Sequence, residues 1–441
     1  MAATSTPDAV RVRRGWYLYG WASHTFPTVV VTVFMSRYLT SLAENAVGTH
    51  GRVHVLGVPI APGSLFAYTV TASTILLVVL MPLVGAIADR TRRKRDIMLG
   101  CGLVGALACV AMVVLTGTDW PLGAALFVVA YLGYSTSIVV SYSLLVDLSA
   151  STERDHVSSV GWAISYLGGG LLLGLDFVLS LAVDKATLAR IALCTAGVWW
   201  IAFSVPVRRR LPAVIGTPDP LGRARSALAA GFVQLAATIR HARGFPLTLA
   251  FLAAFLVYND GIQTVTTVAA QYGDKELKLS DTVLLLGILL VQFVAYVGAI
   301  ALGRLARVFG AKRVVLGSLV VWLGAVGIAY ELQVKVAWQF FALAVLIAIV
   351  LGGAQALSRS IFSRLIPAGS EAAYFGFYEI SDAGTSWLGP LVFGLAYQNT
   401  GNYRSALASL VVFFVVGFVL LALVPLRRAI AAAGNPVPDK V

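Results

Sequence analysis

Three ionisable side chains stand inside long apolar runs of this sequence, where a charge is costly. Asp260 lies in FLVYNDGIQTV, His24 ends WYLYGWASH, and Arg359 lies in ALSRSIF. A charge at the centre of a membrane span costs roughly 2.5–3.5 kcal/mol on insertion scales, so such a residue needs a cavity or a partner. A carboxylate can take up a proton or bind an amino group, an imidazole can carry a proton near neutral pH, and a guanidinium can bind a carboxylate. Asp260 and Arg359 together could recognise a zwitterion.

Amides accompany these ions. Asn259 adjoins Asp260, Gln263 follows on the same run, and Gln355 lies one helical turn before Arg359. We therefore predict a site for substrate or protons formed by Asp260, Asn259, His24, Gln263, Arg359 and Gln355.

Each ion also has a structural alternative. Asp260 could cap a locally broken helix through its own backbone, since Asn259 and Gly261 would let the chain loosen there. His24 could simply hydrogen-bond within a helix bundle. Arg359 could form an ion pair with Glu379 or Asp382, which are three residues apart and share one face of the next helix. Asp176, also in an apolar run, is expected to be solvated or paired.

The composition places these residues in a membrane. Hydrophobic residues make up 59% of the chain and charged residues 12%, and the mean hydropathy is +0.85. Soluble domains carry about 25% charged residues. Several runs reach the roughly 20 apolar residues that cross a bilayer, whereas the segments of about ten alternating residues typical of membrane barrels are missing. We predict an all-α polytopic membrane protein.

Composition and motifs also exclude several classes of function. Cys101, Cys109 and Cys194 all fall in apolar runs without metal-ligand spacing, so neither disulfides nor a metal site is expected. The sequence contains no nucleophile–base set and no phosphate-binding loop, so we expect no enzyme, no cofactor and no nucleotide-driven pump. No basic face is interleaved with exposed aromatics, which argues against nucleic acid as the partner of a chain with net charge +13.

Twelve apolar runs, bounded by charged or turn residues, predict twelve transmembrane helices. They are Trp16–Leu42, Gly63–Ala88, Asp96–Gly117, Pro121–Leu148, Val157–Val183, Thr187–Val207, Phe245–Gln271, Thr282–Leu305, Val314–Glu331, Val336–Phe362, Tyr374–Thr400 and Ser405–Leu426.

The basic residues predict the orientation of these helices. If both termini are cytoplasmic, about 24 of the 33 lysines and arginines fall on the inner side and about 8 on the outer side. We therefore expect cytoplasmic termini, with some of the basic excess contacting anionic lipid. The high ratio of Arg to Lys and the abundance of Ala suggest a GC-rich bacterial genome, and hence the bacterial plasma (inner) membrane.

The longest polar interruption divides the helices six and six. Its beginning, RRRLPAVIGTPDPLGR, is typical of a linker, and its second half spaces apolar residues as in a helix on the membrane surface. The predicted organisation is a cytoplasmic N-terminus (1–15), a six-helix bundle (16–207), a cytoplasmic linker with an amphipathic helix (208–244), a second six-helix bundle (245–426) and a cytoplasmic tail (427–441).

The two halves repeat each other. GAIADRTRRKR from Gly85 matches GRLARVFGAKR from Gly303, SLLVDL matches SIFSRL, and TVVVTV matches TVTTVA. The last pairing places His24 and Asp260 at equivalent depths in the first helix of each half. Two pseudo-symmetric six-helix bundles follow, and transporters built this way bind substrate near the midplane, between the repeats.

The Gly85 segment resembles the loop between helices 2 and 3 of the major facilitator superfamily. Gly85, Asp89, Arg90, Arg93 and Lys94 match its Gly-x-x-x-Asp-Arg-x-Gly-Arg-Arg/Lys pattern, whereas Arg92 replaces the usual glycine. The resemblance implies the major facilitator fold, with helices 1, 4, 7 and 10 around a central cavity.

Five residues of this region form a predicted conformational latch. Asp89 can face the positive N-terminus of a neighbouring helix, and Arg90 or Arg93 can pair with Asp147. The latch residues are Gly85, Asp89, Arg90, Arg93 and Asp147. The alternative is that the cations of the loop only anchor headgroups.

Three further motifs resemble one branch of that superfamily, the autophagy-related vacuolar amino-acid effluxer and its bacterial relatives. They are YNDGIQTV, GGAQALSRSIFSRLIP and TSWLGPLVFG. The first helix departs from the branch pattern Trp-x-x-Tyr-Asp-Trp-Ala-Asn, because Gly20 and Ser23 occupy its polar positions. Val146 likewise replaces the proline usual before Asp147.

The resemblance implies export of small solutes. We expect a secondary active transporter, a monomer among membrane lipids, that moves an amino acid or related metabolite by alternating access with possible proton coupling. The alternatives are an exporter of lipids or drug-like amphiphiles, and a scaffold or receptor that kept the fold and lost transport.

Overall fold

A computed structural model describes residues 7–91, 93–148, 154–212, 240, 243–366, 378, 387–435 and 437. The chain divides into two compact units, and each is described by itself. Unit 1 comprises Met1–Gly51 and Ala72–Leu235, and unit 2 comprises Arg52–Thr71 and Ala236–Val441.

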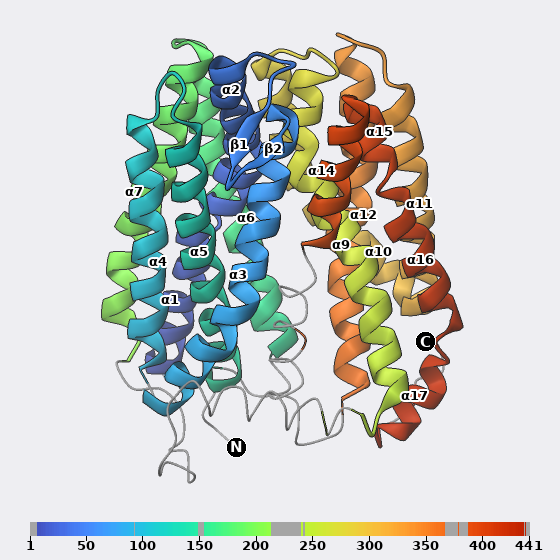
Figure 1. Ribbon diagram of the computed structural model, residues 1–441. Helices are drawn as coiled ribbons and strands as arrows, with labels where there is room; N and C mark the ends of the chain where they lie inside the picture. The colour runs from blue at the N-terminus through green and yellow to red at the C-terminus, as the bar shows by residue number, and fades with distance from the viewer. Residues whose placement is uncertain are drawn as a thin grey trace. The chain divides into compact units, whose positions relative to one another are not determined.

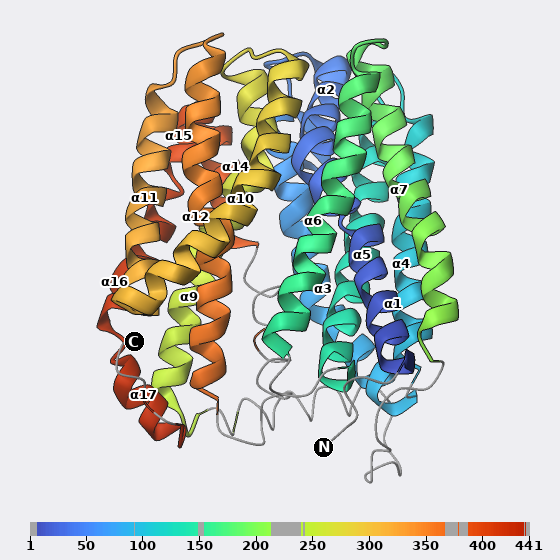
Figure 2. The ribbon, with the colours of Figure 1, turned by 180° about the vertical axis from the view of Figure 1, so that it is seen from behind.

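Unit 1 is built from long helices that run side by side. Helix α4 packs against both α5 and α7, and α1 packs against α6 and α7 (Figures 1 and 2). Its elements are α1 (Pro7–Ser23), η1 (Phe26–Met35), α2 (Ser36–Val47), the later part of α3 (Pro62–Thr91), α4 (Lys94–Ala111), η2 (Met112–Val114), α5 (Trp120–Leu148), α6 (Arg154–Leu179) and α7 (Lys185–Arg210).

The first predicted span is longer than expected and changes its winding. Helix α1 gives way to η1, a π-helix of 10 residues, before α2 continues the span. Pro27 stands at the beginning of η1 and has no N–H to donate to the preceding turn. The hydroxyl of Thr32 donates to the Pro27 carbonyl at 2.8 Å. Such π segments often lie at functional sites, and His24 lies just before this one.

Unit 2 is also helical, with a small hairpin from the first half of the sequence. Helix α12 packs against α10 and α11, and α9 packs against α16 (Figure 2). Its elements are β1 (Val53–Val55), β2 (Val58–Ile60), the first part of α3, α9 (Pro246–Lys275), α10 (Asp281–Phe309), α11 (Ala311–Glu331), α12 (Ala337–Arg364), α14 (Leu388–Thr400), α15 (Tyr403–Ala408), α16 (Val411–Leu423) and α17 (Leu426–Ala432).

Two glutamines hold the segment Arg52–Thr71 in unit 2, although the sequence places it with the first bundle. The amide of Gln398 donates to the Pro59 carbonyl at 3.1 Å and accepts from the Ala61 N–H at 3.4 Å. The amide of Gln271 donates to the Gly63 carbonyl at 3.1 Å. The glutamines thus tie this segment to α9 and α14, and α3 begins in one unit and ends in the other.

The helices have the length and surface of membrane spans. Within the described residues, ten helical stretches are long and apolar enough to cross a bilayer, and α3 and α14 fall in the other two predicted spans. Many outward side chains are apolar, such as Val297, which is 62% exposed, and Phe293, which is 57% exposed. The predicted all-α membrane fold is confirmed at this level.

Side-chain caps fix several helix ends. The carboxylate of Asp184 accepts from the Ala186 and Thr187 N–H groups, both at 3.0 Å, at the start of α7. The hydrogen bonds from Thr187 hold the pKa of Asp184 below its usual range. This cap therefore stabilises the fold fully above the unfolded carboxyl pKa of about 3.9, and the stabilisation is lost as the pH falls through the folded pKa.

Some predicted boundaries were wrong by a few residues. Helix α7 continues through Arg210 rather than ending at Val207. The last predicted span, Ser405–Leu426, contains two helices, because α15 ends at Ala408 and α16 begins at Val411. The predicted amphipathic helix of the linker lies outside the described residues.

Close packing in unit 1 gives a first prediction. A Cβ added at Gly133 of α5 would lie 2.6 Å from the Gly105 nitrogen and 2.8 Å from the Cys101 carbonyl oxygen of α4. Backbone cannot move aside as a flexible side chain can, so Gly133→Ala should destabilise the protein by about 1–3 kcal/mol. The measurement is the melting temperature of the purified protein in detergent.

Gly100→Ala is the matched control. Gly100 lies on α4, the helix that Gly133 contacts, but a Cβ added at Gly100 meets nothing within 4 Å. This control should be neutral or slightly stabilising, because alanine favours helix. Equal melting temperatures for the two variants would show that the α4–α5 contact is looser than described.

Candidate functional site

Asp260 lies on α9 and is 2% exposed. Its Oδ2 accepts a hydrogen bond of 2.7 Å from the backbone N–H of Gly389, in the first turn of α14. The first N–H groups of a helix have no partner within it and carry the positive end of its dipole. The Asp260 carboxylate therefore caps α14 from a neighbouring helix.

Glycine at position 389 makes that contact possible. A Cβ there would collide with the Thr264 hydroxyl oxygen and lie 2.9 Å from Oδ1 of Asp260. The Thr264 hydroxyl itself donates to the Asp260 carbonyl at 2.7 Å. The start of α14 thus rests directly on one turn of α9. Sequence reasoning missed both Thr264 and Gly389, although each lies in a motif that carried the family resemblance.

Helix α9 is not broken at Asp260, as the structural alternative required. It runs without interruption from Pro246 to Lys275. Gly261 serves packing instead, because a Cβ there would lie 2.9 Å from Cβ of Phe413 on α16. Asp260 does act as a cap, but of a different helix, which a local reading of the sequence does not reveal.

Three of the predicted amides meet between α9 and α12. The Nε2 of Gln355 lies 3.4 Å from Oδ1 of Asn259 and 3.4 Å from Oε1 of Gln263. Asn259 is 2% exposed, Gln355 is half-buried and Gln263 is exposed. This amide cluster, Asn259, Gln263 and Gln355, runs from the interior of unit 2 to its surface.

A buried hydroxyl pair fixes the two helices beside the amide cluster. The hydroxyls of Tyr258 and Ser358 lie 2.5 Å apart, and the Ser358 hydroxyl donates to the Ala354 carbonyl at 2.6 Å. Tyr258 precedes Asn259, and Ser358 precedes Arg359. Sequence reasoning missed this pair, because each residue stands beside a more conspicuous polar neighbour.

Arg359 lies one turn after Gln355 on α12 and is half-buried. Its proposed ion-pair partners, Glu379 and Asp382, lie outside the described residues. Whether Arg359 binds substrate or forms that ion pair stays a prediction.

His24 of unit 1 stands against aromatic rings. Its ring meets Tyr166 at a centroid distance of 5.0 Å and Trp162 at 5.8 Å, both edge to face. Tyr142 of α5 extends the group, 6.3 Å from Trp162. His24 and these three residues are half-buried, and the His24 ring makes no hydrogen bond with the described residues. Trp162 and Tyr166 could have been found from their spacing of four on one helix.

Asp176 corrects a sequence expectation. It is 3% exposed rather than solvated, and its Oδ2 has no hydrogen-bond partner among the described residues. The apolar run does not show which of its residues face the interior: Leu175, the neighbour of Asp176, is 53% exposed.

The predicted latch is only partly described. Gly85, Asp89 and Arg90 belong to α3 and Asp147 belongs to α5. The side chains of Asp89, Arg90 and Asp147 lie outside the described part. Arg93 is exposed and occupies the position just before α4. The latch therefore stays a prediction.

The described residues of the candidate site are suited to binding a polar solute. Amides, a carboxylate and an imidazole offer hydrogen bonds and proton exchange to a polar solute. No group of three or more metal-ligating side chains occurs within the described residues.

Comparisons with known proteins agree with this picture. The sequence model of the family described as "Vacuole effluxer Atg22 like" matches residues 8–434. The uncharacterized MFS-type transporter YxiO of Bacillus subtilis is 29% identical over 423 residues, which cover 93% of this chain and 94% of that protein. Autophagy-related protein 22 of Eremothecium gossypii is 28% identical over 462 residues, covering 94% and 90% of the two chains.

Solved transporter structures share the fold. The xylose transporter XylE from E. coli, in a partially occluded inward-open conformation, superposes with a TM-score of 0.67 over 95% of this chain and 97% of that chain, at 12% identity. The nucleoside transporter NupG gives a TM-score of 0.63 over 98% of this chain and 100% of that chain, at 13% identity.

The fold and the family are those of transporters rather than enzymes, and the chain is an integral membrane protein. It belongs to the Atg22-like vacuole effluxer family, within the major facilitator superfamily.

Proposed function

We propose that this transporter exports a small polar solute, an amino acid or a related metabolite, by alternating access. The observation that carries the proposal is the amide cluster on α9 and α12, two helices long enough to span a membrane. A polar side chain facing lipid tails forfeits its hydrogen bonds with water. The exposed Gln263 is therefore best explained by a water-filled path beside α9.

The cluster suits a solute that both donates and accepts hydrogen bonds. Each amide offers a carbonyl oxygen and two N–H groups, and the amides are only weakly engaged with one another at 3.4 Å. Arg359, one turn away on α12, would bind a carboxylate of the solute through two parallel hydrogen bonds. This combination supports an amino acid over an apolar amphiphile.

Asp260 would connect binding to movement. Its carboxylate holds the start of α14, so a proton or a solute amino group that binds Asp260 competes with the Gly389 N–H. Occupation of Asp260 would thus loosen α14 from α9, and release would restore the contact. This is the step through which we propose that protons couple to transport.

The proposal also includes the membrane, the orientation and the oligomeric state. We propose a monomer in a bacterial plasma membrane, the latter on the high ratio of Arg to Lys and the abundance of Ala. The distribution of Lys and Arg supports cytoplasmic termini. Export is supported by the description of the family as effluxers.

Two substitutions at Asp260 separate its cap from its charge. Asparagine keeps a carbonyl oxygen for the Gly389 N–H but cannot ionise, whereas alanine leaves that buried N–H unpaired. We expect Asp260→Asn to retain most stability and Asp260→Ala to lose about 1–3 kcal/mol. The measurements are melting temperature and flux of amino acids from proteoliposomes across a range of pH.

Both variants should transport poorly, and Asp260→Asn should lose the pH dependence of flux. Full activity with unchanged pH dependence in Asp260→Asn would make Asp260 purely structural. If the wild-type protein in proteoliposomes transports amphiphilic dyes but no amino acid, a drug or lipid exporter is favoured. If it transports neither, a scaffold is favoured.

The amide cluster gives an independent prediction. Gln355→Leu removes the amide that contacts both Asn259 and Gln263 while keeping a similar volume. Flux should fall about tenfold or more, because a missing hydrogen bond to a solute costs roughly 1.5 kcal/mol. Gln333→Leu, in the exposed turn before α12, is the control and should transport normally. Equal flux in the two variants would remove the cluster from the path.

The proposed latch is tested by removing the charge of Asp89. Asp89→Asn should slow or bias the exchange between inward-open and outward-open states while leaving the fold intact, because an inner-surface contact loses its charge. Labelling of single cysteines placed along the path reports the exchange. Wild-type labelling in both states would refute the latch.

A further inference from the structure

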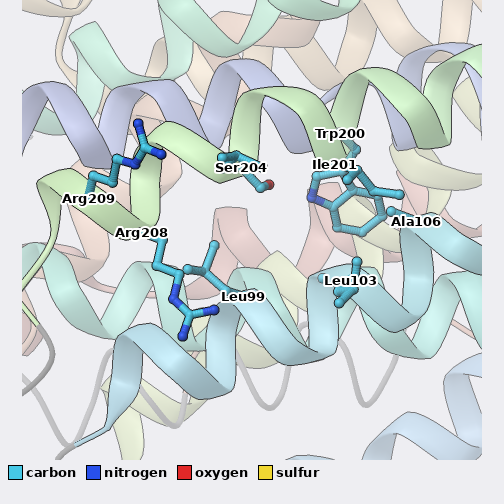
Figure 3. Close-up of a pocket in the computed structure, with 10 residues that line it drawn as sticks. Leu99, Leu103, Ala106, Trp200, Ile201, Ser204, Arg208 and Arg209 are labelled. Carbon is cyan, nitrogen blue, oxygen red and sulfur yellow. The ribbon is translucent and has the colours of Figure 1, made fainter.

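A pocket of about 340 Å³ opens in unit 1 between α4 and α7. Its walls are mostly apolar, with Leu99 and Leu103 contributed by α4 and Trp200 and Ile201 contributed by α7 (Figure 3). The proposed transport path does not use this pocket. Its volume lies at the lower end of the range for small-molecule sites.

Two arginines line one end of the pocket, and their side chains leave α7 in opposite directions (Figure 3). Arg208 and Arg209 lie in the last turn of α7, both are exposed, and their guanidinium groups make no hydrogen bond or ion pair with the described residues (Figure 3). A guanidinium that has no protein partner is available for an anion.

The residues around Arg208 and Arg209 add further positive charge and do not neutralise the two guanidinium groups. Arg95 donates to the backbone carbonyl of Arg208 at 3.3 Å, and Arg11 donates to that of Arg209 at 3.1 Å. Asp96, the carboxylate next to Arg95, is already bound to Arg95 at 2.7 Å. The end of α7 is thus a cationic cluster whose adjacent acid is engaged.

The pocket is oriented along a membrane-spanning helix. The span Lys185–Arg210 ends at the arginines, so they lie at headgroup level, while Trp200 lies eight residues deeper, roughly 12 Å along the helix. Leu103 and Val205, both in the lining, are 47% and 55% exposed, as expected for side chains on the lipid-facing surface of spanning helices. The pocket therefore joins the headgroup layer to the hydrocarbon.

We propose that this pocket binds an anionic phospholipid. The phosphate would lie at Arg208, whose guanidinium can donate two parallel hydrogen bonds to it, while Arg209 adds positive charge nearby, and one acyl chain would lie along Leu99, Leu103 and Ile201. Basic pockets between spanning helices suit anionic headgroups. A zwitterionic lipid would bring its own cation into the cluster and bind less well.

The test measures lipid binding by native mass spectrometry of the intact protein in neutral detergent. Phosphatidylglycerol should bind in preference to phosphatidylcholine of the same chain length. The double variant Arg208→Gln, Arg209→Gln should bind phosphatidylglycerol about 30-fold more weakly. The control is Arg427→Gln, Arg428→Gln on α17, an exposed arginine pair of unit 2, which should bind as the wild type does.

A second pair of variants tests the apolar part of the pocket. Leu103→Trp fills it and should weaken phosphatidylglycerol binding, whereas Leu107→Trp, one turn along α4, similarly exposed and outside the lining, should not. Equal binding of the two lipids, equal loss in the two arginine variants, or no effect of Leu103→Trp would overturn the proposal. Full competition by millimolar inorganic phosphate would also overturn it, since the arginines would then be a site for free anions.

Discussion

Hydrocarbon offers no hydrogen-bond partner, and this constraint governs the whole structure. Backbone groups are satisfied within helices, and the helix ends and polar side chains must find partners in the protein or in water. The hydrogen bond from Gly389 to Asp260 meets the constraint twice, because it satisfies a free N–H of α14 and a buried carboxylate at 2.7 Å. Gln271 and Gln398 likewise bind backbone groups of Pro59, Ala61 and Gly63, at and just before the start of α3.

Small residues allow these bonds to form. Gly389 lets α14 approach Thr264 and Asp260, and Gly261, next to Asp260 on α9, lets α16 approach through Phe413. Helix α9 is thus held closely by two neighbours at the level of its buried acid. In a membrane, packing of this kind replaces the hydrophobic drive that associates helices in water.

Three further polar groups have surroundings of another kind. Gln263 is exposed, His24 is half-buried among aromatic rings, and Asp176 is buried with an unpartnered oxygen among the described residues. A chain selected only for stability would replace them with apolar residues of similar size. Their presence fits a transporter that exposes polar groups to a solute.

The sequence by itself determined the membrane class, most of the helices and which ionisable residues fall within them, because hydrophobicity and helical period are local properties. It also brought Asn259, Gln263 and Gln355 into one candidate set. Only the tertiary structure showed that Asp260 caps α14, that Arg52–Thr71 clusters with unit 2, and that Asp176 lacks a partner among the described residues. Those facts depend on which helix lies beside which, and partners far apart in the chain leave no periodic signal in either segment.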